Sequence, residues 1–188
     1  GIASIVLSQT TFGCSEVGSN IETLTVTDVN GNVSTCTATI TVEDNVAPVA
    51  TCQNVTVQLD EFGFGATTAV EVDNGSTDAC GLLPQCPPSG PMVACLSGLM
   101  LDKSVFDCSE IGSNTVTLTV TDQHYNSSTC TSIVTVEDNI APVAICQDVT
   151  VQLDNTGSGT VSAAQVDNGS SDACGIESMV LSQTVFVC

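Results

Sequence analysis

The feature that most constrains this chain is the repetition of its cysteines at a fixed spacing. Of eleven cysteines, eight form two sets of four, and the second set follows the first by 94 residues. The sequence between the cysteines repeats as well, as in VEDNVAPVATC at 42–52 and VEDNIAPVAIC at 136–146. Self-similarity at a fixed period is the signature of a tandem array, so we expect copies of one small unit. The matched positions are Cys14 and Cys108, Cys36 and Cys130, Cys52 and Cys146, and Cys80 and Cys174.

A third, partial copy shows how long the unit is. GIASIVLSQTTFGC at 1–14 matches GIESMVLSQTVFVC at 175–188. The cysteine of the DAC motif and the cysteine of the F-x-C motif are 28 residues apart in the central copy (80–108) but 14 apart in the last (174–188). The unit therefore has about 80 residues, and the central copy carries an insertion of about 14 within 82–99.

These counts predict the domain organisation. Residues 45–138 form one complete module, residues 1–44 are the C-terminal half of a module, and residues 139–188 are the N-terminal half of a further module. Two interpretations follow: an excerpt of a longer array, or a subunit whose ends complete each other. The length of 188 is twice the period of 94, as expected for the repeating unit of a fibre.

The fold class follows from period-two patterns. TLTVTD at 23–28 and CTATITVED at 36–44 alternate apolar residues with Thr, which is typical of half-buried strands. Asn30-Gly31 between them predicts a two-residue hairpin turn. In the second copy His124 and Tyr125 stand there, which predicts a longer loop. Further strands are expected at 54–59, 65–72 and 4–12, with one short helical turn at 162–166. The sequence thus predicts an all-β chain of tandem immunoglobulin-like antiparallel β-sandwich modules.

Composition limits the partners and the compartment. The chain has 21 acidic residues and one base, Lys103, for a formal net charge of -20, which excludes nucleic acid as a partner because phosphate needs basic side chains. No apolar run reaches the roughly eighteen residues of a membrane span. Eleven cysteines without C-x-x-C pairs favour disulfides over zinc, and so an extracellular protein, secreted or at the cell surface. The alternative is a cytosolic protein with buried thiols.

Disulfides would support a core that is poor in aromatic residues. Pairing by spacing gives separations of 28 and 22 residues, each worth roughly 3–4 kcal/mol. Cys188 corresponds to Cys14 and Cys108, so its partner is placed beyond the end of the chain. The predicted pairs are Cys14–Cys36, Cys108–Cys130, Cys52–Cys80, Cys146–Cys174 and, in the insertion, Cys86–Cys95.

The repeated acidic segment is interpreted as the joint between modules. Pro48 and Pro142 fix φ and bias the preceding residue to extended geometry, which makes the joint short and stiff. Its acids offer hard oxygen ligands for Ca²⁺, although the sequence favours the simpler interpretation that they cap turns in solvent. The candidate calcium ligands are Glu43, Asp44, Asn45, Glu137, Asp138 and Asn139, with a second acidic group at Asp73, Asp78, Asp167 and Asp172. No other cofactor is expected.

Surface chemistry points to glycans and away from catalysis. The single histidine, His124, has Asn30 as its counterpart, and no nucleophile–base pair can be assembled from it, so no catalytic residue is predicted. O-linked glycans on Ser and Thr of the outward strand faces are one expectation. The N-x-[ST] pattern adds five N-linked candidates: Asn32, Asn54, Asn74, Asn126 and Asn168.

The motifs together carry a family resemblance. APVATCQNVTVQLD, VDNGSTDACG, LSQTTFGC and TLTVTDVNGNVSTCTATITVEDN resemble the hyalin-repeat (HYR) and related immunoglobulin-like modules that occur in tandem in large secreted or surface proteins of bacteria, notably the Bacteroidetes. The resemblance covers nearly the whole chain except 82–99. It implies an adhesive or fibre-forming role at the cell surface and no family-wide catalytic site.

Two functions are therefore weighed. The first is a structural subunit of an extracellular fibre or surface filament, decorated with covalent glycans, whose partners are copies of itself joined head to tail. The second is a Ca²⁺-dependent adhesin or glycan-binding surface module, with the insertion at 82–99 as its recognition loop. An enzyme is not expected.

Overall fold

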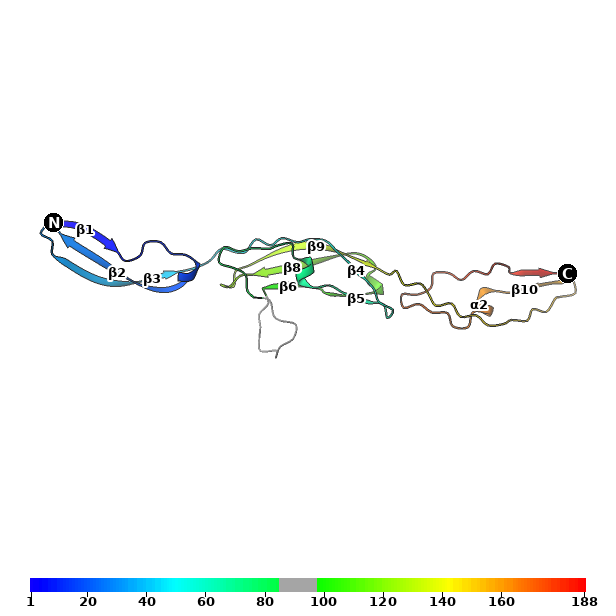
Figure 1. Ribbon diagram of the computed structural model, residues 1–188. Helices are drawn as coiled ribbons and strands as arrows, with labels where there is room; N and C mark the ends of the chain where they lie inside the picture. The colour runs from blue at the N-terminus through cyan, green and yellow to red at the C-terminus, as the bar shows by residue number, and fades with distance from the viewer. Residues whose placement is uncertain (85–97) are drawn as a thin grey trace, which may run out of the picture. The chain divides into compact units, whose positions relative to one another are not determined.

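The computed structural model describes residues 1–84 and 98–188, and its regular secondary structure is mostly β-strand (Figure 1). The predicted disulfide Cys86–Cys95 and most of the predicted insertion lie outside these residues. The all-β, disulfide-linked immunoglobulin-like class is confirmed. In chain order the elements are β1 (Ile2–Leu7), the 3-10 helix η1 (Cys14–Glu16), β2 (Gly18–Asp28), β3 (Val33–Val42), β4 (Val55–Gln58), β5 (Phe64–Ala66), α1 (Ala69–Val72), β6 (Leu99–Leu101), β7 (Val105–Asp107), the 3-10 helix η2 (Cys108–Glu110), β8 (Gly112–Thr121), β9 (Ser127–Glu137), β10 (Ser158–Thr160), α2 (Ala163–Val166) and β11 (Val185–Val187).

The strands of the described residues form four sheets. One has the order β1-β2-β3, another β4-β9-β8-β6, and two are the pairs β5-β7 and β10-β11 (Figure 1). The pairs β1–β2, β2–β3, β5–β7 and β10–β11 are antiparallel. β4 runs parallel to β9, with Val55 opposite Val134 and Gln58 opposite Glu137. The antiparallel pattern that we predicted therefore has one parallel exception.

Two short helices begin at capping boxes. The predicted strand at 54–59 is confirmed by β4, but the one at 65–72 is wrong beyond Ala66, where α1 follows. The Glu71 carboxylate accepts the Thr68 N–H at 2.8 Å, and the Thr68 hydroxyl accepts the Glu71 N–H at 3.3 Å. This reciprocal pair starts a helical turn. In the next copy the Gln165 amide oxygen accepts the Ser162 N–H at 2.8 Å, and α2 confirms the turn predicted at 162–166.

The hairpin loops of two copies share one geometry despite their different sequences. In each, the carboxylate of the first residue, Asp28 or Asp122, accepts two backbone N–H groups at 2.8–2.9 Å. The Asp28 N–H donates to the Asn32 carbonyl, which leaves three residues in the loop. Tyr125 has a φ of 67° where Gly31 has 87°. The predicted two-residue turn is wrong. The second loop is longer than two residues, as we predicted, but it has the same three-residue length as the first, because an aspartate cap holds both turns.

The chain divides into two compact units, each described by itself. The first comprises Gly1–Cys52, Asp73–Met100 and Leu118–Cys130, and it contains the disulfides Cys14–Cys80 and Cys52–Cys130. The second comprises Gln53–Val72, Leu101–Thr117 and Thr131–Cys188, and it contains Cys108–Cys174. Among the residues described, no helix has the length and hydropathy that crossing a bilayer requires.

Burial differs sharply between repeated strands. On β8 and β9 one face is closed, and Val116, Leu118, Val120, Val134 and Val136 are at most 1% exposed. The same face of β3 is open, since its Ala38 is exposed and its Ile40 and Val42 are only half-buried. The sequence pattern is alike in both places, so the difference arises from which segments cover the strands.

Candidate functional site

Each joint is spanned by a disulfide. Cys14–Cys80 connects η1, before the first joint at 42–52, to the DAC loop after it. Cys108–Cys174 connects η2 to the DAC loop after the second joint at 136–146. Both pairs are 66 residues apart in sequence. A loop of this size contributes about 4 kcal/mol by restricting the unfolded chain.

The four disulfide pairs predicted within 1–84 and 98–188 are wrong. Cys36 lies in the middle of β3, opposite Leu24, and is therefore distant from Cys14 at the far end of the hairpin. The parallel pairing of β4 with β9 instead brings Cys52 beside Cys130, 78 residues away. The corrected pairs replace Cys14–Cys36, Cys108–Cys130, Cys52–Cys80 and Cys146–Cys174. Cys36, Cys146 and Cys188 are free and exposed.

His124 lies at the first joint. Its Nδ1 is 3.0 Å from Asp44 Oδ2, and Asn126 Nδ2 donates to the Asp44 carbonyl at 3.0 Å. The other carboxylate oxygen of Asp44 accepts the Val46 N–H at 3.1 Å. The loop that carries His124 therefore fixes the backbone of the joint, a role that sequence reasoning missed because the two segments are about 80 positions apart.

A pair of aspartates recurs at each joint. Asp44 faces Asp78, and Asp138 faces Asp172, with one ligand atom of each within 4.8 Å of the other and of a cysteine sulfur. Those sulfurs, in Cys80 and Cys174, are part of disulfides and are not thiolates. Ca²⁺ takes six to eight oxygen ligands. Two carboxylates per joint do not complete a calcium site by themselves.

The remaining calcium candidates bind other partners. Asn45 Nδ2 donates to the Glu43 carboxylate at 3.2 Å. Glu137 accepts from Gln58 Nε2 at 2.7 Å and from Asn139 Nδ2 at 3.3 Å. Of the six candidate ligands, only Asp44 and Asp138 lie close to another carboxylate in the groups found among the described residues. Their neighbours are Asp78 and Asp172, which belong to the second acidic group.

The other acids of the second group cap turns. Asp73 accepts the N–H groups of Gly75 and Ser76, at 3.2 and 3.1 Å. Asp167 accepts those of Gly169 and Ser170, at 3.3 and 3.0 Å. The hydrogen bond from the Ser170 side chain, followed by that from its backbone, lowers the pKa of Asp167. These contacts are those of turn-capping carboxylates.

The five glycosylation candidates differ in the hydrogen bonds of their side chains. The Nδ2 groups of Asn32 and Asn126 each donate to a loop carboxylate at 2.8 Å. Asn54 Oδ1 accepts an N–H of β9 at 3.0 Å. Asn74 and Asn168 lie exposed in the two DNGS loops. Because an N-linked glycan attaches to the side-chain nitrogen, Asn74 and Asn168 offer the better acceptor geometry.

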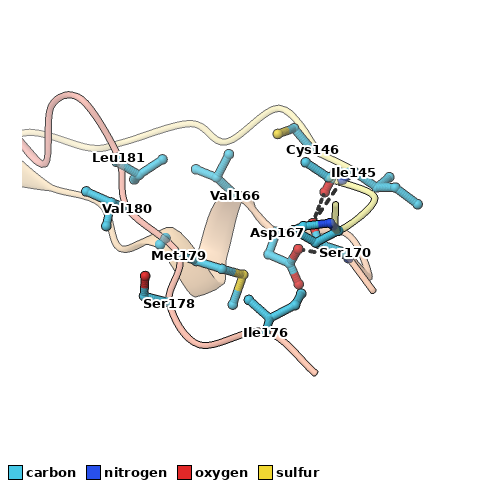
Figure 2. Close-up of a pocket in the computed structure, with 13 residues that line it drawn as sticks. Ile145, Cys146, Val166, Asp167, Ser170, Ile176, Ser178, Met179, Val180 and Leu181 are labelled. Carbon is cyan, nitrogen blue, oxygen red and sulfur yellow. Dashed lines mark hydrogen bonds between the residues drawn. The ribbon is translucent and has the colours of Figure 1, made fainter. Parts of the chain in front are cut away.

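A hollow of about 240 Å³ with mostly apolar walls opens in the second unit. Val166 lines it together with Met179 and the free Cys146 (Figure 2). The counterpart of Val166 is Val72, which is fully buried, and the counterpart of Met179 is Leu99. Leu99 is 9% exposed, whereas Met179 is 47% exposed. The hollow therefore occupies positions that form part of a closed core in the central copy.

Comparisons with known proteins give a distant likeness only. The chain is similar to the structure titled "Protocadherin gammaB7 EC3-6 cis-dimer structure", with 20% identity over 82% of this chain and 46% of that one, at a TM-score of 0.36. It is also similar to "Protocadherin Gamma B7 extracellular cadherin domains 1-4 P21 crystal form", with 18% identity over 88% and 52% and a TM-score of 0.35. The chain thus spans about half the length of each. At these TM-scores the likeness carries no argument about function.

No family model matches the chain, and no curated protein matches it. The candidate site therefore rests on the geometry of this chain alone: two disulfide-spanned joints, an open face on β3 and an open hollow beside Cys146.

Proposed function

We propose that this chain is a structural subunit of an extracellular fibre or surface filament of hyalin-repeat type, in which immunoglobulin-like modules follow one another head to tail. One observation carries the proposal: residues 1–44 and residues 139–188 present complementary halves of a module. Residues 1–44 supply β1, β2 and β3 with an open apolar face, and residues 139–188 supply β10, α2 and β11 around an open hollow. In residues 45–138 the counterparts of both halves occur together, and their core is closed.

The joints support the same proposal. Each is spanned by a disulfide and carries a proline, Pro48 or Pro142, and the first also receives contacts from His124 and Asn126. Such a joint restricts bending between successive modules, as a load-bearing fibre requires. The disulfides support an oxidising compartment outside the cell as the protein's location. The repeat motifs favour a bacterial surface protein.

Glycans belong to the proposal. We expect them first at Asn74 and Asn168, because their side chains are exposed while those of Asn32 and Asn126 are held by loop carboxylates. Glycans at these repeated positions would mark each module in the same way.

Electron microscopy of the purified chain tests the fibre. The expected result is long uniform filaments whose axial repeat corresponds to two modules. A protein that stays monomeric at high concentration, with its two end segments folded onto each other in a closed particle, would refute the proposal.

A Ca²⁺-dependent adhesin is the second candidate. The observation that favours it is the aspartate pair at equivalent positions of both joints, Asp44 with Asp78 and Asp138 with Asp172. Sugar hydroxyls could supply the oxygens that each pair lacks. A glycan array probed with the chain in Ca²⁺ and again in EDTA distinguishes the candidates, since only the adhesin binds, and only when Ca²⁺ is present.

A further inference from the structure

The disulfide Cys52–Cys130 closes the central module and has no completed counterpart at either end of the chain. The residue 94 positions after Cys52 is Cys146, and the residue 94 positions before Cys130 is Cys36. Both are free and exposed. The chain therefore carries the two halves of one further disulfide, one in residues 1–44 and one in residues 139–188.

The backbone around Cys146 makes the same hydrogen-bonded contacts as the backbone around Cys52. Cys52 forms an isolated bridge with Asp73, and Cys146 forms the same bridge with Asp167. The residue after each cysteine donates its N–H to the last residue of the following helix, at 2.9 Å for Gln53 and 2.8 Å for Gln147. Cys146 is thus held in the backbone setting that Cys52 has in a finished disulfide.

Cys36 also lies in a backbone conformation that matches its counterpart, Cys130. It lies on β3 within a hairpin whose register is complete from Gly18 opposite Val42 to Thr27 opposite Val33. On the equivalent strand β9, Cys130 stands on the face that carries the buried Val134 and Val136. Cys36 stands on the corresponding open face of β3, so its thiol lies on the surface that lacks a cover.

A strand is also missing beside it. The sequence VTVQ occurs at Val55–Gln58, where it forms β4 in parallel register with β9, and again at 149–152, where it forms no strand. The local sequence is identical, so the strand at 55–58 depends on its neighbour β9. By the 94-residue offset, the strand that would receive residues 149–152 is β3, with Val149 opposite Ile40.

Apolar side chains near Cys146 are exposed where their counterparts near Cys52 are buried. Leu59, just after β4, is 3% exposed, and its counterpart Leu153 is 47% exposed. Phe106 is 1% exposed, and its counterpart Phe186 in the F-x-C motif is 39% exposed. Side chains that are covered in the central module are uncovered in the C-terminal half, where a cover equivalent to β8 and β9 is lacking.

We propose that Cys146 of one copy forms a disulfide with Cys36 of a second copy, while residues 149–152 of the first copy join β3 of the second as a parallel strand. This inference rests on the proposed fibre and assigns its covalent link. Residues 1–14 and 175–188 are copies of one segment, but each copy supplies a different strand, since β1 corresponds to β6 and β11 corresponds to β7. Cys14 is already bonded to Cys80, so Cys188 remains a thiol.

The receiving face also carries an acidic residue. Glu22 on β2 takes the place of Val116, but it is 7% exposed and already receives a hydrogen bond from the Ser8 hydroxyl. Its carboxylate therefore enters the new interface with a partner, which limits the cost of covering it.

Formation of the link needs a disulfide oxidant such as oxidised glutathione. The Cys146 thiolate attacks one glutathione sulfur, which breaks the glutathione disulfide and releases one glutathione thiolate. The Cys36 thiolate of the second copy then attacks the Cys146 sulfur and releases the second. Two protein thiols lose two protons and two electrons in total, and one glutathione disulfide becomes two thiols.

The test uses three full-length chains in a Cys188→Ser background: one otherwise unchanged, one with Cys36→Ser and one with Cys146→Ser. Each is incubated with a glutathione redox buffer and run on a non-reducing gel. The unchanged chain is expected to give a ladder in steps of 19.1 kDa. Each single variant is expected to stay monomeric, and their mixture is expected to stop at a dimer, because only one competent pair of cysteines remains.

Peptide mapping identifies the bond. Digestion without reduction, with one variant labelled with ¹⁵N, should yield a linked peptide that joins labelled and unlabelled segments around Cys36 and Cys146. Circular dichroism checks that all three chains are folded. A mixture without dimers, or an unchanged chain that forms the bond within one monomer, would overturn the inference.

The fibre and the link can fail separately. Filaments in which Cys36 and Cys146 still react fully with a maleimide would exclude the disulfide and leave the fibre intact. Crosslinked ladders that never assemble into filaments under the microscope would support the disulfide and count against the fibre.

Discussion

At the scale of single residues, Tyr125 is the one non-glycine residue within 1–84 and 98–188 that has a positive φ. It has a φ of 67°, in the left-handed region, and its side chain is 68% exposed. Gly31 holds the equivalent place in the first hairpin. The left-handed conformation costs a non-glycine residue roughly 1–2 kcal/mol. Asp122 sustains it by accepting two backbone N–H groups of the loop.

Replacing Tyr125 with glycine is therefore expected to stabilise the chain by about 1 kcal/mol, because the strain is removed and little packing is lost. The matched control is Gly31→Ala, which has open space around the new Cβ but introduces the same strain, and so should destabilise by a similar amount. Urea denaturation of both variants with disulfides intact measures the change. Equal stability of Tyr125→Gly and the parent would contradict the assignment of strain.

The loop aspartates also set a pH dependence. Burial raises the pKa of Asp122, but hydrogen bonds from the Asn126 side chain and from the N–H groups of Asn126 and His124 outweigh it, so the pKa lies below its ordinary value. For Asp28 the hydrogen bond from the Asn32 side chain is the largest cause of the same shift. A carboxyl group with a lowered pKa in the folded state stabilises the fold above its ordinary pKa of about 4 and loses that contribution as the pH falls through the folded value.

We accordingly expect the free energy of unfolding to fall as the pH drops below about 4. In Asp122→Asn this dependence should be weaker, because one of the responsible groups no longer titrates, although the variant is less stable at pH 7. Urea titrations between pH 7 and pH 2 give both curves. Parallel curves for parent and variant would show that Asp122 does not contribute, and Asp28→Asn serves as the comparison in the other hairpin.

At the scale of elements, the two VTVQ segments show how much a strand depends on its neighbour. At 55–58 the segment lies beside β9, and the following Leu59 is 3% exposed. At 149–152 it has no strand partner, and Leu153 is 47% exposed. Turn and cap signals behave differently, since the capping boxes at Thr68 and Ser162 form in both copies. Local hydrogen bonds repeat with the sequence, whereas strands repeat only where a partner is present.

This contrast predicts unequal costs for one substitution. In the isolated chain Leu59→Ala is expected to destabilise by about 2–5 kcal/mol, because it removes a buried side chain from a closed core. Leu153→Ala should lower the free energy of unfolding by less than about 1 kcal/mol, because the Leu153 side chain is already 47% exposed. Denaturant unfolding of the two variants measures the difference. A comparable loss in both would mean that residues 139–188 are covered by another segment of the same chain.

At the scale of the whole molecule, the two repeated acidic segments that we interpret as joints, at 42–52 and 136–146, have matching contacts. Each is spanned by a disulfide with a sequence separation of 66 residues, and each has an aspartate pair next to it. The first joint is also held by His124 at 3.0 Å from Asp44. These contacts hold the backbone at the joints through the chain's own side chains and disulfides.

Calcium is therefore expected to leave the melting temperature of the chain unchanged. Each pair offers two carboxylates where Ca²⁺ takes six to eight oxygens, so binding in the absence of sugar is weak. Differential scanning calorimetry in Ca²⁺ and in EDTA checks this. If Ca²⁺ raises the melting temperature by several degrees, and this rise disappears in Asp78→Asn and Asp172→Asn, the aspartate pairs bind calcium and do not only cap turns.

The sequence by itself determined the repeat and the β class. These depend on alternation, turn residues and period, which act over a few residues and survive in every copy. It did not determine which cysteines pair, whether VTVQ is a strand, or what His124 contacts. Those depend on segments that are 66 to 80 positions apart, and only the tertiary structure decides which of them become neighbours.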